Sequence, residues 1–144
     1  MYTIAQIEDA IVVELQASAV LTALNTTIDS YHGEIDDLVK MSGQLTIKLP
    51  AIYVLFGGAA YSEPANRSYD KELSFTVIAI AKDLRGDDKL KAAMYPILQE
   101  IEAVLVDNAL DIDIEPMHPL RVEPELITKL FSIYSFDFKT SFSL

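Results

Sequence analysis

The chain has 144 residues, a length that fits a single domain, and apolar residues make up 51% of it. This apolar content excludes an intrinsically disordered chain, because disorder requires low hydrophobicity together with high net charge. The 22 acidic and 11 basic residues give a net charge of −11. Since a negatively charged surface repels phosphates, we expect no sequence-specific binding to nucleic acid.

The chain contains no cysteine. We therefore expect no disulfide framework, no thiolate metal site and no cysteine nucleophile. The first fifteen residues contain three acids and no Lys or Arg, whereas a secretory signal begins with basic residues. The longest nearly apolar run, 51–61, is shorter than the roughly 18–20 residues that span a bilayer, so we expect no membrane contact.

The N-terminal residues predict an amphipathic helix over 4–17. Thr3 and Gln6 form a capping-box pattern, in which each side chain satisfies a free backbone N–H. Apolar residues then recur at spacings of three and four, which places them on one face: Ile4, Ile7, Ile11 and Leu15. A first strand is predicted over 20–31, followed by a short helix near 35–42.

The middle of the chain predicts a pair of strands. The most apolar segment, 51–56, indicates a buried strand, and Gly57 and Gly58 are expected to end it. A polar loop over 62–69 leads to a second strand over 71–82. Because both faces of this second strand are apolar toward its C-terminal end, we expect it to lie centrally in the sheet.

A second helix is predicted from Gly86 to Asp107. Pro96 lies inside this pattern and must kink the helix or mark a restart, because its ring clashes with the preceding turn. The segment 110–115 alternates isoleucine with acid. The prolines that follow it, within 116–124, predict a broken connection without regular structure.

The last predicted strand covers 130–142, where aromatic residues alternate with polar ones. At about 3.3 Å per residue it would be roughly 43 Å long. A compact domain of this length has a radius of gyration near 14–15 Å, so the strand must bend or reach past its own domain toward a neighbour. The complete pattern predicts one α+β domain over 1–144. Its mixed, mostly antiparallel sheet has about 4–5 strands, and two main helices pack on one face.

The acids Asp111, Asp113 and Glu115 alternate with isoleucines. On a strand they would share one face, where three carboxylates suit a hard cation and a metal-dependent enzyme. The favoured interpretation is an edge strand with Ile112 and Ile114 inward and the acids in water, where their charge discourages edge-to-edge pairing. The sequence contains no recognisable catalytic or cofactor motif, so we expect neither a catalytic site nor a cofactor.

Four segments form an ordered set along the chain: IAQIEDAI at 4–11, IDSYHGEI at 28–35, LPAIYVLFGGA at 49–59 and YSFDFKT at 134–140. Together they resemble a family of small proteins encoded in Mu-like prophages and related contractile tails. The resemblance implies a structural tail-terminator role, not an enzyme. It also implies a ring, commonly hexameric, that caps the tail tube and joins it to the head connector. The alternatives are another tail or baseplate component and, less favoured, the metal-dependent enzyme.

This role implies contacts with further copies of the chain, with the tail tube protein and with a head-completion protein. Assembly would take place in the bacterial host cytoplasm and end in the virion tail. DNA would pass through the ring without being specifically bound, so a negative lumen would prevent sticking. The candidate lumen acids are Asp111, Asp113, Glu115, Glu34, Asp36 and Asp37. The candidate subunit-interface residues are Phe131, Ile133, Phe138 and Phe142.

Overall fold

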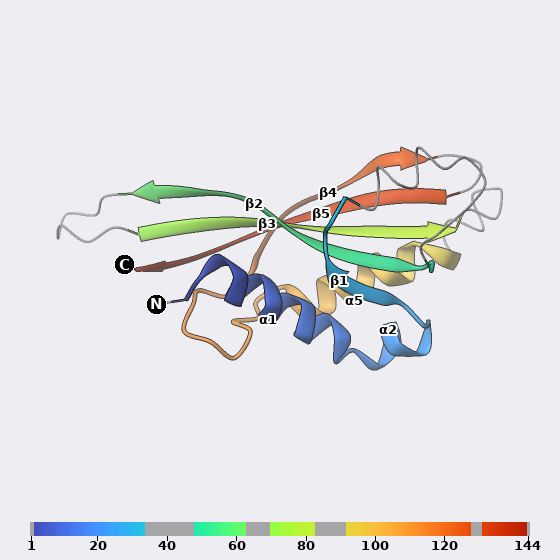
Figure 1. Cartoon of the computed structure of the whole chain (residues 1–144), viewed down its shortest axis with the longest axis horizontal. Coiled ribbons are helices and arrows are strands. Elements are labelled where there is room, and N and C mark those ends of the chain that lie inside the picture. Colours follow the sequence, from blue (N-terminus) through green and yellow to red (C-terminus); the bar gives the residue numbers. More distant parts are fainter. Residues whose placement is uncertain (1, 34–47, 63–69, 83–91, 128–130, 144) are drawn as a thin grey trace.

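The computed structural model describes residues 2–33, 48–62, 70–82, 92–127 and 131–143. In this part of the chain one five-stranded sheet has the order β1-β2-β3-β5-β4, and helices cover one of its faces (Figure 1). Strand β1 runs parallel to β2, and the other neighbours are antiparallel. The predicted α+β class and mixed sheet are confirmed. The elements are α1 Ile4–Gln16, α2 Ala19–Ala23, β1 Thr27–Ser30, β2 Ala51–Ser62, β3 Asp70–Lys82, α5 Tyr95–Leu105, β4 His118–Ile127 and β5 Phe131–Ser143.

The predicted first helix is confirmed as α1, with both hydrogen bonds of the capping box. The Thr3 N–H donates to Gln6 Oε1 at 2.8 Å, and the Gln6 N–H donates to Thr3 Oγ1 at 3.1 Å. The strand predicted over 20–31 is wrong in its first half. Ser18 caps α2 there by accepting a hydrogen bond from the Leu21 N–H, and β1 contains only four residues.

The two glycines do not end β2, which continues to Ser62. Gly57 is instead the extra residue of a β-bulge, because Phe56 pairs with Phe75 and Gly58 pairs with Ser74. A Cβ on Gly57 would lie 3.3 Å from the Ser74 carbonyl oxygen, and Gly58 has a φ of +131°. A bulge at this position therefore favours glycine on two separate grounds.

Strand β3 lies between β2 and β5, so its predicted central position is confirmed. Its side chains Leu73, Phe75 and Val77 are fully buried in the core that α1 and α5 cover. A second, smaller core lies on the opposite face of the sheet. Its buried members are Ala51, Tyr53, Ile78, Ile80, Phe131 and Ile133.

Pro96 marks a helix restart, which is one of the two predicted alternatives. It lies in the first turn of α5, which follows a turn at Met94. Proline is tolerated at this position because the first N–H groups of a helix have no intrahelical partner. The expected beginning of this helix near Gly86 lies outside the described residues, as does the short helix expected over 35–42.

The connection expected over 116–124 is wrong, since β4 occupies most of it. This strand lies at the edge of the sheet, and its pairing with β5 shifts register beside Pro119 and again beside Pro124. An edge strand tolerates proline because the missing N–H can face away from its neighbour. The edge strand expected over 110–115 is also wrong, because these residues form turns and bends.

The long last strand is confirmed as β5, and it is paired with β3 along its full length from Phe131 to Ser143. The ends of β2, β3 and β5 reach together beyond the N-terminal end of α1 (Figure 1). We call the half of the sheet that carries these ends the arm: Leu55–Ser62 of β2, Asp70–Thr76 of β3 and Asp137–Ser143 of β5. Leu73, Phe75 and Phe138 of the arm are buried in the core beneath the helices, so only its tip lies beyond α1. The sequence predicts that β5 bends or reaches past its own domain, and in the structure its end lies beyond α1 together with the ends of β2 and β3.

Candidate assembly surfaces

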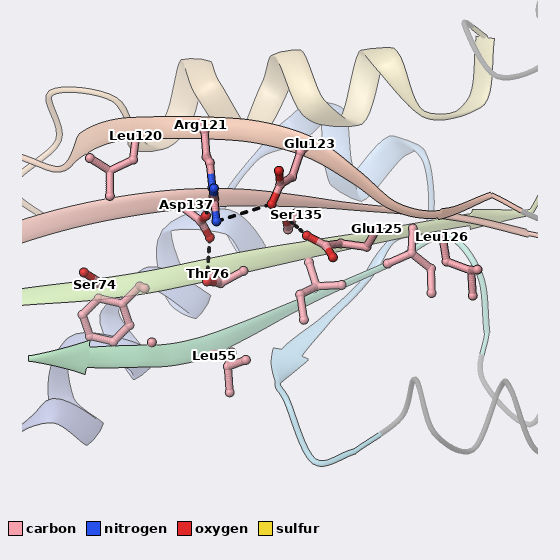
Figure 2. Close-up of a pocket in the computed structure, with 14 residues that line it drawn as sticks. Leu55, Ser74, Thr76, Leu120, Arg121, Glu123, Glu125, Leu126, Ser135 and Asp137 are labelled. Atoms are coloured by element: carbon pink, nitrogen blue, oxygen red, sulfur yellow. Dashed lines mark hydrogen bonds and ion pairs between the residues drawn. The ribbon is translucent and has the colours of Figure 1, made fainter.

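The helix-free face of the sheet holds an open groove of about 770 Å³. Strand β3 supplies its floor with Ser74 and Thr76, while Leu55 of β2 lies on one side (Figure 2). On the other side β4 contributes residues that alternate along the strand, including Arg121 and Glu123. Because the groove crosses four strands, its shape depends on the sheet register and not on any single segment.

A polar network joins three strands across this groove. Asp137 of β5 accepts a hydrogen bond from Thr76 Oγ1 of β3 at 2.7 Å, and another from Arg121 Nε of β4 at 2.9 Å (Figure 2). Arg121 Nη2 also lies 3.4 Å from Glu123 Oε1. The hydrogen bond to Asp137 and the charge of Glu123 raise the pKa of Arg121, so its guanidinium stays charged.

A second polar pair continues the network along the groove. Ser135 Oγ donates to Glu125 Oε1 at 2.6 Å (Figure 2). The described residues lining the groove thus contain three carboxylates and one guanidinium, a net charge of −2. Thr76, Arg121 and Ser135 each donate to a carboxylate of the same chain, an arrangement typical of a rigid surface. The described residues that line the groove include no histidine, so the hydroxyl groups of Thr76 and Ser135 pair with carboxylates alone.

The acids Asp111, Asp113 and Glu115 lie on the loop between α5 and β4, and all three are exposed. Ile114 is buried, so the loop directs its acids to water much as the favoured interpretation expected of a strand. Main-chain contacts hold the loop in place: the Glu115 N–H donates to the Ser141 carbonyl at 2.9 Å, and the Asp113 N–H donates to the Tyr2 hydroxyl at 3.3 Å.

Within the described residues no group of three or more His, Cys, Asp or Glu side chains is arranged to hold a metal ion. Because residues 110–115 do not form a strand, their acids do not share one face of a sheet. The other candidate lumen acids, Glu34, Asp36 and Asp37, lie outside the described residues. The role of all six acids in a lumen stays a prediction.

Three of the four candidate subunit-interface residues are core residues of the single chain, and the interface role of Phe142 stays a prediction. Phe131, Ile133 and Phe138 are buried within a single chain, with exposed fractions of 5%, 1% and 0%. Phe138 stacks on Phe136 with ring centroids 4.3 Å apart, beneath the helices. Phe142 pairs with Lys71 near the end of β5, and its side chain lies outside the described part. Phe131 and Ile133 therefore belong to the core on the helix-free face of the sheet, and Phe138 belongs to the core beneath the helices.

The exposed apolar side chains lie on other elements. Those on β4 are Leu120, Val122, Leu126 and Ile127, and those on the arm are Leu55 and Tyr61. The others are Val13 of α1, Val20 of α2, Leu24 at the C-cap of α2 and Tyr95 at the beginning of α5. The sequence does indicate a strand at β4, since Leu120, Val122 and Leu126 alternate with charged residues. The prolines in the same segment led instead to the prediction of an irregular connection.

Comparison with protein families decides the affiliation of the chain. The family described as Bacteriophage Mu, Gp37 matches residues 3–143, which is almost the full length. The chain belongs to the bacteriophage Mu Gp37 family. The predicted resemblance to a Mu-like phage family is confirmed, and this Gp37 family member is a phage structural tail protein.

The fold of the Gp37 family member also has a solved counterpart. A chain from the virion of a native gene transfer agent (GTA) particle superimposes on it with a TM-score of 0.65. The two chains share 16% sequence identity, and the likeness covers 100% of each. At this identity the comparison establishes a shared fold. No curated protein matches the sequence. No helix of the described residues has both the length and the apolar character needed to cross a membrane.

Proposed function

We propose that this Gp37 family member is a tail terminator, a subunit of a ring that caps the tail tube and joins it to the head connector. The observation that carries the proposal is the family match over 3–143. The fold shared over the full chain with a component of a GTA virion supports a place in a particle of this kind. The partners in this role are further copies of the chain, commonly six in a ring, the tail tube protein and a head-completion protein.

The shape and chemistry of the subunit support a structural role in a contractile tail. The tip of its arm reaches past α1, as suits a subunit that contacts neighbours on either side (Figure 1). Its groove contains a hydrogen-bonded polar network that joins neighbouring strands of the sheet. The protein acts by assembly in the host cytoplasm and then as part of the virion, without enzymatic chemistry or a cofactor.

The acidic balance supports a channel that lets DNA pass. With a net charge of −11, a ring of such subunits repels phosphates over distances of about a Debye length, 8–10 Å. Asp111, Asp113 and Glu115 are exposed on one loop and contribute to this field. Replacing all three by Asn and Gln should slow DNA ejection from assembled particles. Unchanged ejection would remove this loop from the proposed lumen.

Electron microscopy of tails made without this protein tests the proposal. A terminator stops growth of the tube, so its absence should give tails of abnormal and variable length. Complementation with the intact chain should restore one length. Complete absence of tails would instead indicate an initiator or baseplate component, and tails of normal length would refute a role in termination.

A further inference from the structure

The two outer edges of the sheet differ in how they are protected from strand addition. An edge strand presents unpaired N–H and C=O groups, which are a template for pairing with another chain. On one side β4 contains two prolines, and its register shifts beside each of them. Both features disfavour continuous pairing. Next to it, the end of β5 is covered where the Glu115 N–H donates to the Ser141 carbonyl.

On the other side, β1 covers only the beginning of β2. It pairs with Ala51–Val54, and the Tyr31 N–H donates to the Val54 carbonyl. From Leu55 to Ser62, β2 has no strand partner on its outer side among the described residues. We call this segment the open edge. Beyond the bulge at Gly57, its residues pair with β3 in regular antiparallel register as far as Ser62.

The open edge contains no protective charge or proline. Its sequence, LFGGAAYS, contains neither a charged residue nor a proline. Ala59 and Ala60 are exposed and small, so a second backbone can approach closely. Leu55 and Tyr61 flank them with exposed fractions of 37% and 61%. The only interruption is the bulge at Gly57, which leaves Gly58–Ser62 as the part most suited to strand addition.

We propose that the open edge pairs with a β-strand of a second copy of this chain and forms the subunit contact of the ring, an inference that rests on the proposed function. Charge favours this occupant. Two copies each carry a net charge of −11, so they approach most easily along a seam without charge. A basic partner would instead be recruited by acids, and the open edge has none. Main-chain hydrogen bonds supply affinity there without any charged group.

Symmetry restricts which strand of the second copy is used. If two open edges paired with each other about a two-fold axis, the assembly would close at a dimer. A ring requires a heterologous contact, in which two different surfaces of the same chain meet. The open edge of one copy therefore pairs with a different strand of the next copy.

The substitution Ala60→Lys tests this contact, because lysine is a common guard of natural strand edges. Ala60 is exposed and lies opposite Glu72 of β3, whose Oε2 lies 3.9 Å from Lys139 Nζ. The new ammonium group would share this exposed carboxylate, so the fold should be kept. Ala103→Lys is the matched control, since Ala103 is exposed on α5 away from the sheet edge. Thermal unfolding of the dilute chains verifies that both variants fold.

The first measurement is self-association of the purified full chain by analytical ultracentrifugation at rising concentration. The Ala60→Lys variant should need a concentration at least about tenfold higher to form rings, and Ala103→Lys should behave as wild type. The second measurement is hydrogen exchange of the wild-type chain. The amides of Gly58–Ser62 should exchange more slowly in the ring than in the monomer. Rings that form equally well with Ala60→Lys, or that leave exchange in Gly58–Ser62 unchanged, would overturn the proposal.

Tail length separates this inference from the proposed function. Ala60→Lys should give the same abnormal tails as loss of the protein, while Ala103→Lys gives normal tails. If loss of the protein alters tail length and Ala60→Lys does not, the open edge is wrong and the terminator role stands. If loss of the protein leaves tail length normal, the terminator role fails. If Ala60→Lys alters tails while purified wild-type chains stay monomeric at every concentration, the occupant is the tail tube protein and the second-copy contact is refuted.

Discussion

Phe138 distinguishes a core residue from an interface residue, and its replacement by alanine tests the structural assignment directly. The side chain is completely buried, stacks on Phe136 and contributes to the core beneath the helices. Removing a buried aromatic ring typically costs about 3–5 kcal/mol, from lost transfer energy and from the cavity that remains. This is a large part of the roughly 5–15 kcal/mol by which a domain is stable.

The assay is urea unfolding of dilute, monomeric protein followed by circular dichroism. With an m value of about 2 kcal/mol/M, a loss of about 4 kcal/mol lowers the unfolding midpoint by about 2 M. Should Phe138→Ala fail to fold, Ile133→Val gives a milder test, because Ile133 is 1% exposed and this change typically costs about 0.5–1.5 kcal/mol. Val13→Ala is the control, since Val13 is 61% exposed and should change stability by less than about 0.5 kcal/mol.

The reasoning would be refuted if Phe138→Ala unfolded at the wild-type midpoint and weakened only self-association. That result would place the aromatic side chain of Phe138 in a subunit contact, as the sequence alone suggested. A core role predicts the opposite pattern: the free energy of unfolding falls at every protein concentration, because the lost contacts lie within one chain.

Three further outcomes are expected. Thr76→Val removes the donor to Asp137 but keeps the β-branched shape, so urea unfolding should show a loss of about 0.5–1.5 kcal/mol; an unchanged midpoint would mean that the hydrogen bond adds nothing. Thr3→Ala removes the side-chain cap of α1 and should cost about 1 kcal/mol, and a wild-type melting curve would contradict this. Burial, then the charge and hydrogen bond of Tyr95, raise the pKa of Tyr134 above 10.0. The neutral phenol is thus favoured in the folded state, and its stabilising contribution is lost as pH rises above about 10. Ultraviolet titration of the wild type and of Tyr134→Phe gives the ionisation of Tyr134 as the difference between the two curves, and its midpoint should lie above 10. A difference curve with a midpoint at or below 10 would contradict the raised pKa of Tyr134.

Local sequence determined the elements whose signals lie within a few residues. Helix α1 follows from the capping box at Thr3 and Gln6 and from apolar residues at helical spacing, all within about four turns of chain. The chemistry of the proline ring predicts an interruption at Pro96, either a kink or a restart, and the structure shows the restart. Strand β5 follows from its alternation and length. The ordered motifs also identified the phage family, which the family match confirms.

Tertiary structure decided what depends on neighbouring strands. Pro119 and Pro124 fit inside a strand because β4 lies at the edge of the sheet, and the local sequence does not contain that position. The local sequence predicts that Gly57 ends the strand. In the structure Gly57 is the extra residue of a β-bulge, where a Cβ would lie close to the carbonyl oxygen of Ser74 on the neighbouring strand.

Tertiary structure also decided which apolar residues are buried within the chain and where an edge without charge lies. Apolar residues on β5 indicate burial in either case, but the partner that buries them comes from elsewhere in the chain. Helices α1 and α5 cover Phe138, and the exposed apolar side chains lie instead on β4, on the arm and on the helices. Charge and composition fixed the repulsion between copies of the chain. Only the order of the strands showed where the described residues leave an uncharged edge open, because hydrogen-bond partners along a sheet are distant in sequence.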